Sequence, residues 1–134
     1  MFECAVLGDS IAVGIARLRN TCQAHAVVGI TSDAYVSRFQ NGVRAGHALI
    51  SLGSNDGSDS RSETAMRLLR SRITADQVTW LLSANNQRTA DLARKIAREH
   101  GDRVLEVRPV VGPDGVHPTT AGYFRLAAMW RPDR

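Results

Sequence analysis

Two short polar segments, one near each end of the chain, have the residue types needed for acyl transfer through a serine. Ser10 ends a Gly-Asp-Ser segment that follows a short apolar run and opens a predicted helix. A hydroxyl at this position is exposed, and its own backbone N–H lies near the positive end of the helix, where negative charge is stabilised. His117, in an Asp-Gly-Val-His-Pro segment, can take and return a proton near neutral pH, and Asp114 can orient its ring. Taken alone, the first segment also fits a helix N-cap, and the second fits an ordinary surface histidine.

Two further segments offer hydrogen-bond donors for a negatively charged oxygen. Gly29 follows a second apolar run, and a residue without a Cβ lets a backbone N–H approach a ligand closely. Asn55 lies in a Gly-Ser-Asn-Asp segment after a third apolar run, and its side-chain amide can donate. With the backbone N–H of Ser10, these groups would form an oxyanion hole. The alternatives are a turn glycine and an Asx-turn in a polar loop.

Short apolar runs alternate along the chain with segments of helical period, as in βαβ units around a parallel sheet. Strands are predicted at 4–7, 24–28, 47–52, 78–82 and 104–107, and helices at 11–19, 33–39, 62–73, 88–100 and from Thr119 or Thr120 onward. This predicts an α/β fold: a three-layer α/β/α sandwich with a five-stranded parallel sheet in the flavodoxin-like order 2-1-3-4-5. In such a sheet the loops at the carboxyl ends of the strands meet at one edge, so all four polar segments are expected there.

The sequence resembles the SGNH (GDSL-like) hydrolase superfamily, whose four sequence blocks supply Ser, Gly, Asn and His. The resemblance lies in the order of the nucleophile, the oxyanion donors and the acid–base pair, each after a predicted strand. The resemblance implies that Ser10 is the nucleophile, that Asp114 and His117 are its acid–base partners, and that Ser10, Gly29 and Asn55 form the oxyanion hole. Such a site needs neither a metal nor an organic cofactor. The blocks span nearly the whole chain, and the Gly29 match is the least specific.

The resemblance further implies a serine ester hydrolase that works through an acyl-serine. The chain is short for this family, so the loops that build substrate pockets must be trimmed, which suits a small acyl group such as acetyl on a carbohydrate. The alternatives are a thioesterase or lysophospholipase of the same family, or a catalytically silent glycan-binding module of a larger assembly.

Several other classes of protein find no support in the sequence. The Gly-x-Ser-x-Gly nucleophile motif and the phosphate-binding P-loop motif are absent. A phospho-accepting receiver domain would share the fold, but the single lysine, Lys95, falls in a predicted helix. The seven aromatic residues are not interleaved with the basic ones, so no nucleic-acid partner is expected, and the net charge of +4 indicates a solvated basic surface.

The remaining expectations come from length and composition. At 134 residues the chain is predicted to form one domain, 1–134, and no apolar stretch has the roughly 20 residues of a membrane-spanning helix. Cys4 and Cys22 lack the spacing of a metal or redox site and are expected to be free thiols. With no visible signal peptide, a cytoplasmic location is expected. Nothing in the sequence indicates an oligomeric state.

Overall fold

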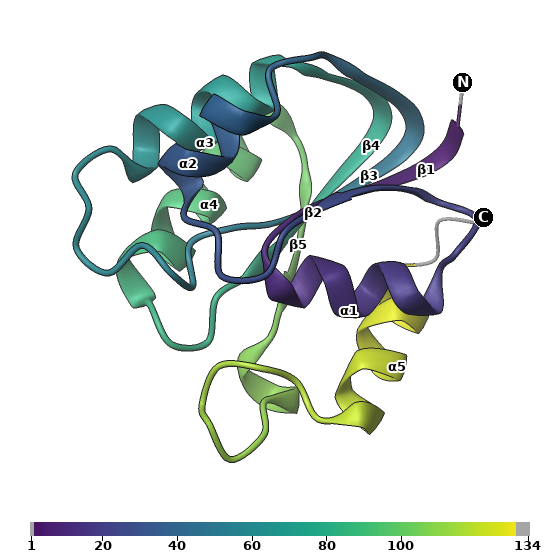
Figure 1. Cartoon of the computed structure of the whole chain (residues 1–134), viewed down its shortest axis with the longest axis vertical. Helices are drawn as coiled ribbons and strands as arrows, with labels where there is room; N and C mark the ends of the chain where they lie inside the picture. The colour runs from purple at the N-terminus through teal and green to yellow at the C-terminus, as the bar shows by residue number, and fades with distance from the viewer. Residues whose placement is uncertain (1, 131–134) are drawn as a thin grey trace.

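A computed structural model describes residues 2–130, which form a parallel β-sheet covered by helices on both faces (Figure 1). The strands are β1 (Phe2–Gly8), β2 (Gln23–Ala26), β3 (Val43–Ser51), β4 (Ile73–Leu82) and β5 (Arg103–Glu106). The helices are α1 (Ser10–Leu18), α2 (Ser32–Arg38), α3 (Ser62–Ser71), α4 (Gln87–His100) and α5 (Thr120–Trp130), with a 3-10 turn at Arg108–Val110. The strand order is β2-β1-β3-β4-β5, so the predicted fold class and strand order are confirmed.

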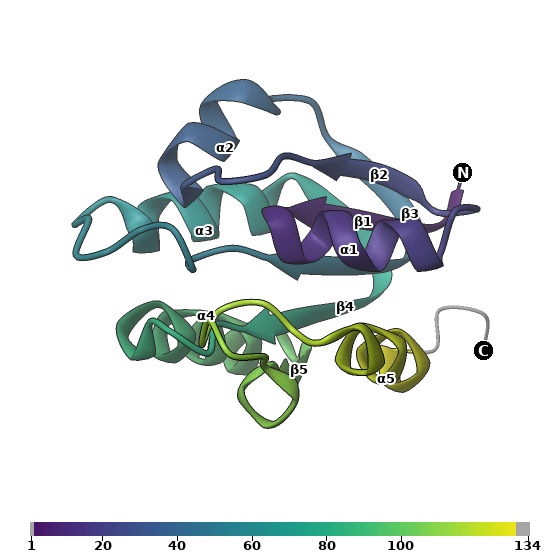
Figure 2. The ribbon, with the colours of Figure 1, turned by 60° about the horizontal axis from the view of Figure 1, so that its bottom comes forward.

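The two faces of the sheet carry separate hydrophobic cores. Successive β1 side chains point to opposite faces, so Leu7 joins the core under α2, α3 and α4, and Val6 joins the core under α1 and α5. Trp80 and Trp130 are the largest fully buried side chains, one in each core. Figures 1 and 2 show the resulting three layers, with α1 and α5 next to each other on one face.

The predicted strand boundaries differ from the observed ones mainly at the amino ends of β3 and β4. Both strands begin several residues earlier than predicted, and Val43 pairs with Ile73 at their start. Polar residues such as Arg44 and Gln77 interrupt the apolar pattern there. A prediction based on continuous apolar runs finds only the buried carboxyl-terminal halves of these strands.

Both ends of α4 have capping residues. Asn86 caps α4 by accepting a hydrogen bond from the Thr89 N–H, and Gly101 ends the helix in the left-handed conformation. At fourteen residues α4 is the longest described helix, and within residues 2–130 no helix is long and apolar enough to span a membrane.

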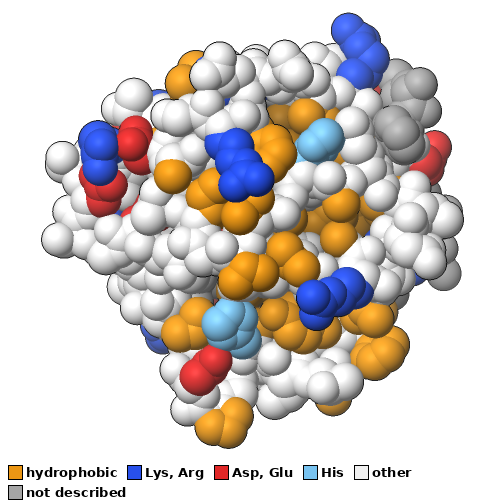
Figure 3. Space-filling view, in the orientation of Figure 1, with side chains coloured by type: hydrophobic (Ala, Val, Ile, Leu, Met, Phe, Trp, Pro, Cys, Tyr) orange, Lys and Arg blue, Asp and Glu red, His pale blue; other side chains and the backbone are white. Residues whose placement is uncertain are grey.

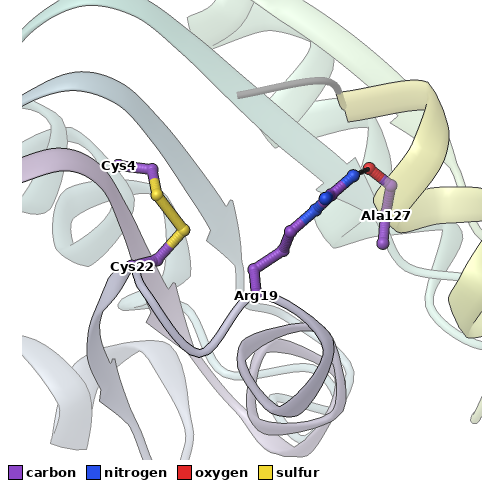
Figure 4. Close-up of a disulfide and its surroundings, with 4 residues drawn as sticks. All are labelled: Cys4, Arg19, Cys22 and Ala127. Carbon is purple, nitrogen blue, oxygen red and sulfur yellow. Dashed lines mark hydrogen bonds between the residues drawn. A yellow bond between two sulfur atoms is a disulfide. The ribbon is translucent and has the colours of Figure 1, made fainter. Parts of the chain in front are cut away.

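The prediction of two free thiols is wrong. Cys4 and Cys22 form a disulfide that joins β1 to the segment leading into β2 (Figure 4). The strand register explains the pairing, because Ala5 lies opposite Gln23 and the residue before each is a cysteine, with 4.7 Å between the two Cα atoms. A sequence separation of 18 residues gives no sign of this neighbourhood, which only the strand pairing creates.

Near the disulfide, Arg19 at the end of α1 donates a hydrogen bond to the Ala127 carbonyl of α5.

Candidate active site

The turn between β1 and α1 places Ser10 at the carboxyl edge of the sheet. Gly8 ends β1 at φ 137°, and a Cβ there would lie 1.8 Å from the carbonyl oxygen of Ser51, so only glycine fits. Asp9 is the N-cap of α1 and accepts a hydrogen bond from the Ile11 N–H at 3.1 Å. Ser10 therefore starts the helix, with its hydroxyl facing the loop that precedes α5.

A chain of two hydrogen bonds joins Ser10 to the segment before α5. The Oγ of Ser10 lies 2.8 Å from Nε2 of His117, and Nδ1 of His117 lies 2.7 Å from Oδ2 of Asp114. An ionised carboxylate only accepts hydrogen bonds, so Nδ1 carries the ring proton and Nε2 accepts from the serine hydroxyl. The structure thus brings together the three side chains that the sequence selected as nucleophile, base and acid.

Backbone contacts hold this histidine loop in place. Oδ1 of Asp114 accepts hydrogen bonds from the N–H groups of Val116 and His117, and the N–H of Gly112 donates to the His117 carbonyl. The hydrogen bond from the His117 ring, with those from the backbone N–H groups of Val116 and His117, holds the pKa of Asp114 down at about 2. The carboxyl is exposed to solvent. Asp114 is therefore ionised at neutral pH and can stabilise a positive charge on the ring.

The triad lies open to solvent rather than in a deep cavity. The side chain of His117 is 44% exposed and that of Asp114 is 52% exposed. The expectation that the loops around the site are trimmed stays a prediction.

The two proposed oxyanion loops lie side by side at the same edge. The side-chain amide of Asn55 donates to the Ile30 carbonyl at 3.0 Å, which ties the loop after β3 to the loop after β2 and leaves a second amide hydrogen for another acceptor. Gly29 has φ 77°, a conformation that favours glycine, and a Cβ there would meet no atom within 4 Å. Within residues 2–130, neither the Ser10 N–H nor the Gly29 N–H donates to another group.

Asp56 supports the site and was not selected from the sequence. It is buried, its Oδ1 accepts from the Ser32 N–H at 2.8 Å, and its Oδ2 accepts from the Ser62 hydroxyl at 2.7 Å. One carboxylate thus fastens the Asn55 loop to the starts of both α2 and α3. Its position directly after Asn55 was the only feature of the sequence that could have indicated this role, because its hydrogen-bond partners are distant in sequence.

Gly53 has a steric role in the same loop. It has φ 111°, and a Cβ would lie within 2.6 Å of Thr89 side-chain atoms. The Thr89 hydroxyl and the Asn86 amide both donate to the Gly53 carbonyl. The amino end of α4 therefore fixes where the Asn55 loop leaves β3.

Asp9 is the second buried carboxyl of the site. It is fully buried, and burial raises its pKa to about 6 even though the Ser51 hydroxyl and the Ile11 N–H donate to its Oδ1. Within the described part of the chain, its Oδ2 has no hydrogen-bond partner. Asp9 and Ser10 are adjacent in the chain, but one side chain points into the protein and the other points out.

A groove of about 430 Å³ runs from the triad between α1 and α5. Figure 3 shows hydrophobic side chains exposed on this face, close to a histidine that has an acidic side chain beside it. The groove is lined by Ser10, Val13, Gly14, Arg17, Leu18, Val28, His117, Thr120, Tyr123 and Phe124.

No family model and no curated protein sequence matches the chain. Several solved structures do match the chain. A protein assigned as an acylhydrolase from Bacteroides fragilis is 18% identical with a TM-score of 0.68, over 93% of this chain and 82% of that one. A protein assigned to the G-D-S-L family of lipolytic proteins from Desulfitobacterium hafniense is 16% identical with a TM-score of 0.61, over 99% of both chains.

The chain has the fold of the GDSL-like hydrolases. A carbohydrate acetylesterase family member from Sinorhizobium meliloti has the same fold, at 13% identity and a TM-score of 0.61, over 97% of this chain and 95% of that one. At these identities the likeness establishes the GDSL-like fold, and the chemistry depends on the side chains at the site.

Proposed function

We propose that the protein is a serine ester hydrolase that acts through an acyl-serine intermediate. The observation that carries this proposal is the hydrogen-bonded chain from Ser10 through His117 to Asp114, at the sheet edge where α/β proteins bind ligands. An ordinary helix cap gives no reason for a histidine and a carboxylate from the far end of the chain to align on that hydroxyl.

In the first half of the reaction, Nε2 of His117 takes the hydroxyl proton while Oγ of Ser10 bonds to the ester carbonyl carbon. The carbonyl electrons move to its oxygen, and the N–H groups of Ser10 and Gly29 and the free amide hydrogen of Asn55 stabilise that charge. Collapse of this intermediate breaks the bond to the alcohol oxygen, which receives the proton from His117.

In the second half, water replaces the alcohol. His117 takes one proton from the water as its oxygen bonds to the acyl carbon, and a second tetrahedral oxyanion forms in the same hole. The bond to Oγ then breaks, Ser10 recovers the proton from His117, and the carboxylic acid leaves. Asp114 stays ionised throughout and stabilises the charged ring.

The proposed substrate is a small acyl ester, with acetyl on a carbohydrate as the first choice. The exposed triad supports this choice because a substituent of a large molecule can reach it without passing through a tunnel. The carbohydrate acetylesterase among the fold neighbours also supports it. A thioester or a lysophospholipid is the second choice.

The first test compares hydrolysis of p-nitrophenyl acetate, butyrate and octanoate by the wild type and by Ser10→Ala. We expect acetate to be the best substrate and Ser10→Ala to lose on the order of 10⁴-fold or more in turnover. A fluorophosphonate should label the wild type once per chain and leave Ser10→Ala unlabelled.

Ser54→Ala is the matched control, because Ser54 lies at the same sheet edge but its hydroxyl donates to Ser83. It should keep both activity and labelling. Absence of turnover and of labelling in the wild type would refute the esterase and leave the silent glycan-binding module as the explanation of the site.

A second test addresses the oxyanion hole. Asn55→Ala removes one donor and should lower turnover by roughly 100- to 1,000-fold. Asn55 also donates to Ile30, so the variant is compared with the wild type for fluorophosphonate labelling and thermal unfolding. Undiminished turnover would exclude Asn55 from the hole.

A further inference from the structure

The groove beside the triad has walls of two chemical kinds. The side chains that line it from α1 recur at helical spacing, so Ser10, Val13 and Arg17 lie along one face of that helix. Arg17 lies seven positions after Ser10 in the helix, which is about 10 Å along the axis. The groove therefore leads from the reacting hydroxyl, over apolar side chains, to a cationic one.

The chemistry of the triad decides which half of an ester enters this groove. His117 must give its proton to the alcohol oxygen, so that oxygen must lie within hydrogen-bond reach of Nε2. His117 itself lines the groove, whereas Gly29 and Asn55 do not. This lining favours the alcohol half in the groove, with the carbonyl oxygen toward Gly29 and Asn55.

The side chain of Arg17 has no bonding partner within the described part of the chain. Within residues 2–130, its guanidinium makes no ion pair and no hydrogen bond, while the neighbouring Arg19 donates to the Ala127 carbonyl. Its side chain is exposed, and Arg17 lines the groove together with Tyr123. Arg17 is therefore a solvated cation that faces the groove.

The floor and rim of the groove are apolar and aromatic. A Cβ on Gly14 would lie 2.3 Å from the Tyr123 ring, so this helical glycine makes room for the ring at the bottom of the groove. Val28 and Phe124, at 69% and 59% exposure, are two large hydrophobic side chains that remain exposed, and both line the groove. Apolar walls with one well-placed charge are typical of a site for a molecule with an apolar surface and an oppositely charged group.

We propose that the groove binds the alcohol half of the ester and that Arg17 selects alcohols bearing an anionic group, a carboxylate or a phosphate. The proposal rests on the esterase function above. The apolar walls contact the carbon skeleton of the alcohol, and the anion lies beside the guanidinium at the far end. Arg17 is a specificity-determining residue in this scheme and takes no part in proton transfer.

The test uses two pairs of acetate esters that differ in one charge. Acetylated methyl galacturonide and acetylated methyl galactoside separate a saccharide carboxylate from its neutral form. Acetylated glycerol 3-phosphate and acetylated glycerol do the same for a phosphate. Acetate release is measured for the wild type, Arg17→Gln and Arg125→Gln, the last being an exposed arginine of α5 that does not line the groove.

We expect the wild type to prefer the anionic member of at least one pair by about fivefold in kcat/KM, the range of an exposed ion pair. Arg17→Gln should bring that ratio close to one, Arg125→Gln should leave it unchanged, and added salt should reduce it. The pair that shows the preference identifies whether the anion is a carboxylate or a phosphate.

Equal rates on both members of each pair, or the same preference in Arg17→Gln, would overturn the proposal while leaving the esterase intact. If the wild type releases acetate from none of the four esters, the esterase proposal is decided separately by p-nitrophenyl acetate turnover and fluorophosphonate labelling. Titration of Ser10→Ala with both pairs of esters then decides the anion subsite by binding alone. Selective binding that Arg17→Gln removes would support the subsite, and its absence would refute it.

Discussion

Two carboxyl groups flank the serine–histidine pair, and their surroundings are opposite. Asp9 is fully buried beneath Ser10, and burial raises its pKa to about 6. Asp114 is half exposed beside His117, and the hydrogen bonds it accepts lower its pKa to about 2. Asp9 is held in place by the protein core, and Asp114 is held by the backbone of its own loop.

The comparison shows that closeness to the nucleophile does not make a carboxyl part of the triad. Asp9 is adjacent to Ser10 in sequence, yet its hydrogen bonds run to the backbone of α1 and to Ser51 of β3. Asp114 is more than a hundred residues away and is the carboxyl that contacts the histidine. Asp9 should therefore affect mainly stability, and Asp114 mainly turnover.

Of the two carboxyls, Asp114 should have the larger effect, seen in Asp114→Asn. Asparagine keeps an oxygen to accept from the Val116 and His117 N–H groups, so the loop should persist. Its amide can donate to the ring, which favours the wrong tautomer, and it cannot stabilise the charged imidazole. We expect turnover of p-nitrophenyl acetate to fall on the order of 10²- to 10⁴-fold with little change in KM.

The unfolding free energy of Asp114→Asn, measured in urea, serves as its control and should stay close to that of the wild type. Turnover within about threefold of the wild type would place Asp114 outside the triad and remove the distinction between the two carboxyls.

A smaller effect is expected from Asp9, on the pH dependence of stability. Its pKa rises from 3.8 in the unfolded chain to about 6 in the folded protein, so between these values the folded state binds the proton more tightly. Stability from this group is then greatest at low pH and falls as pH rises through 6. Relative to Asp9→Asn, the wild type should gain about 1 kcal/mol of unfolding free energy between pH 7 and pH 5.

Urea unfolding at the two pH values measures this gain. Asp76→Asn is the control, because Asp76 is exposed and should show the same pH dependence as the wild type. The same pH dependence in Asp9→Asn and the wild type would mean that Asp9 is not the buried acid described above.

The disulfide is relevant to the cellular location of the protein. Thiols are kept reduced in the cytosol, and disulfides persist in oxidising compartments. The cytoplasmic location expected from the sequence stays a prediction, and the Cys4–Cys22 bond stands against it.

The sequence by itself determined the elements and the chemical groups. Apolar runs, helical spacing and capping residues are local signals, and they placed the five strands and five α-helices of residues 2–130 with errors mainly at the polar beginnings of β3 and β4. Because parallel strands end at one edge, their order also predicted that Ser10, Asn55 and His117 would gather there.

Only the tertiary structure decided how these groups contact one another. The Cys4–Cys22 bond, the role of Asp56 and the groove that ends at Arg17 depend on strand register and on the packing of α1 against α5. Each joins residues that no local pattern relates, because their neighbourhood arises when distant segments pack together. The sequence thus supplied the reacting groups, and the packing supplied the surface beside them that a substrate would contact.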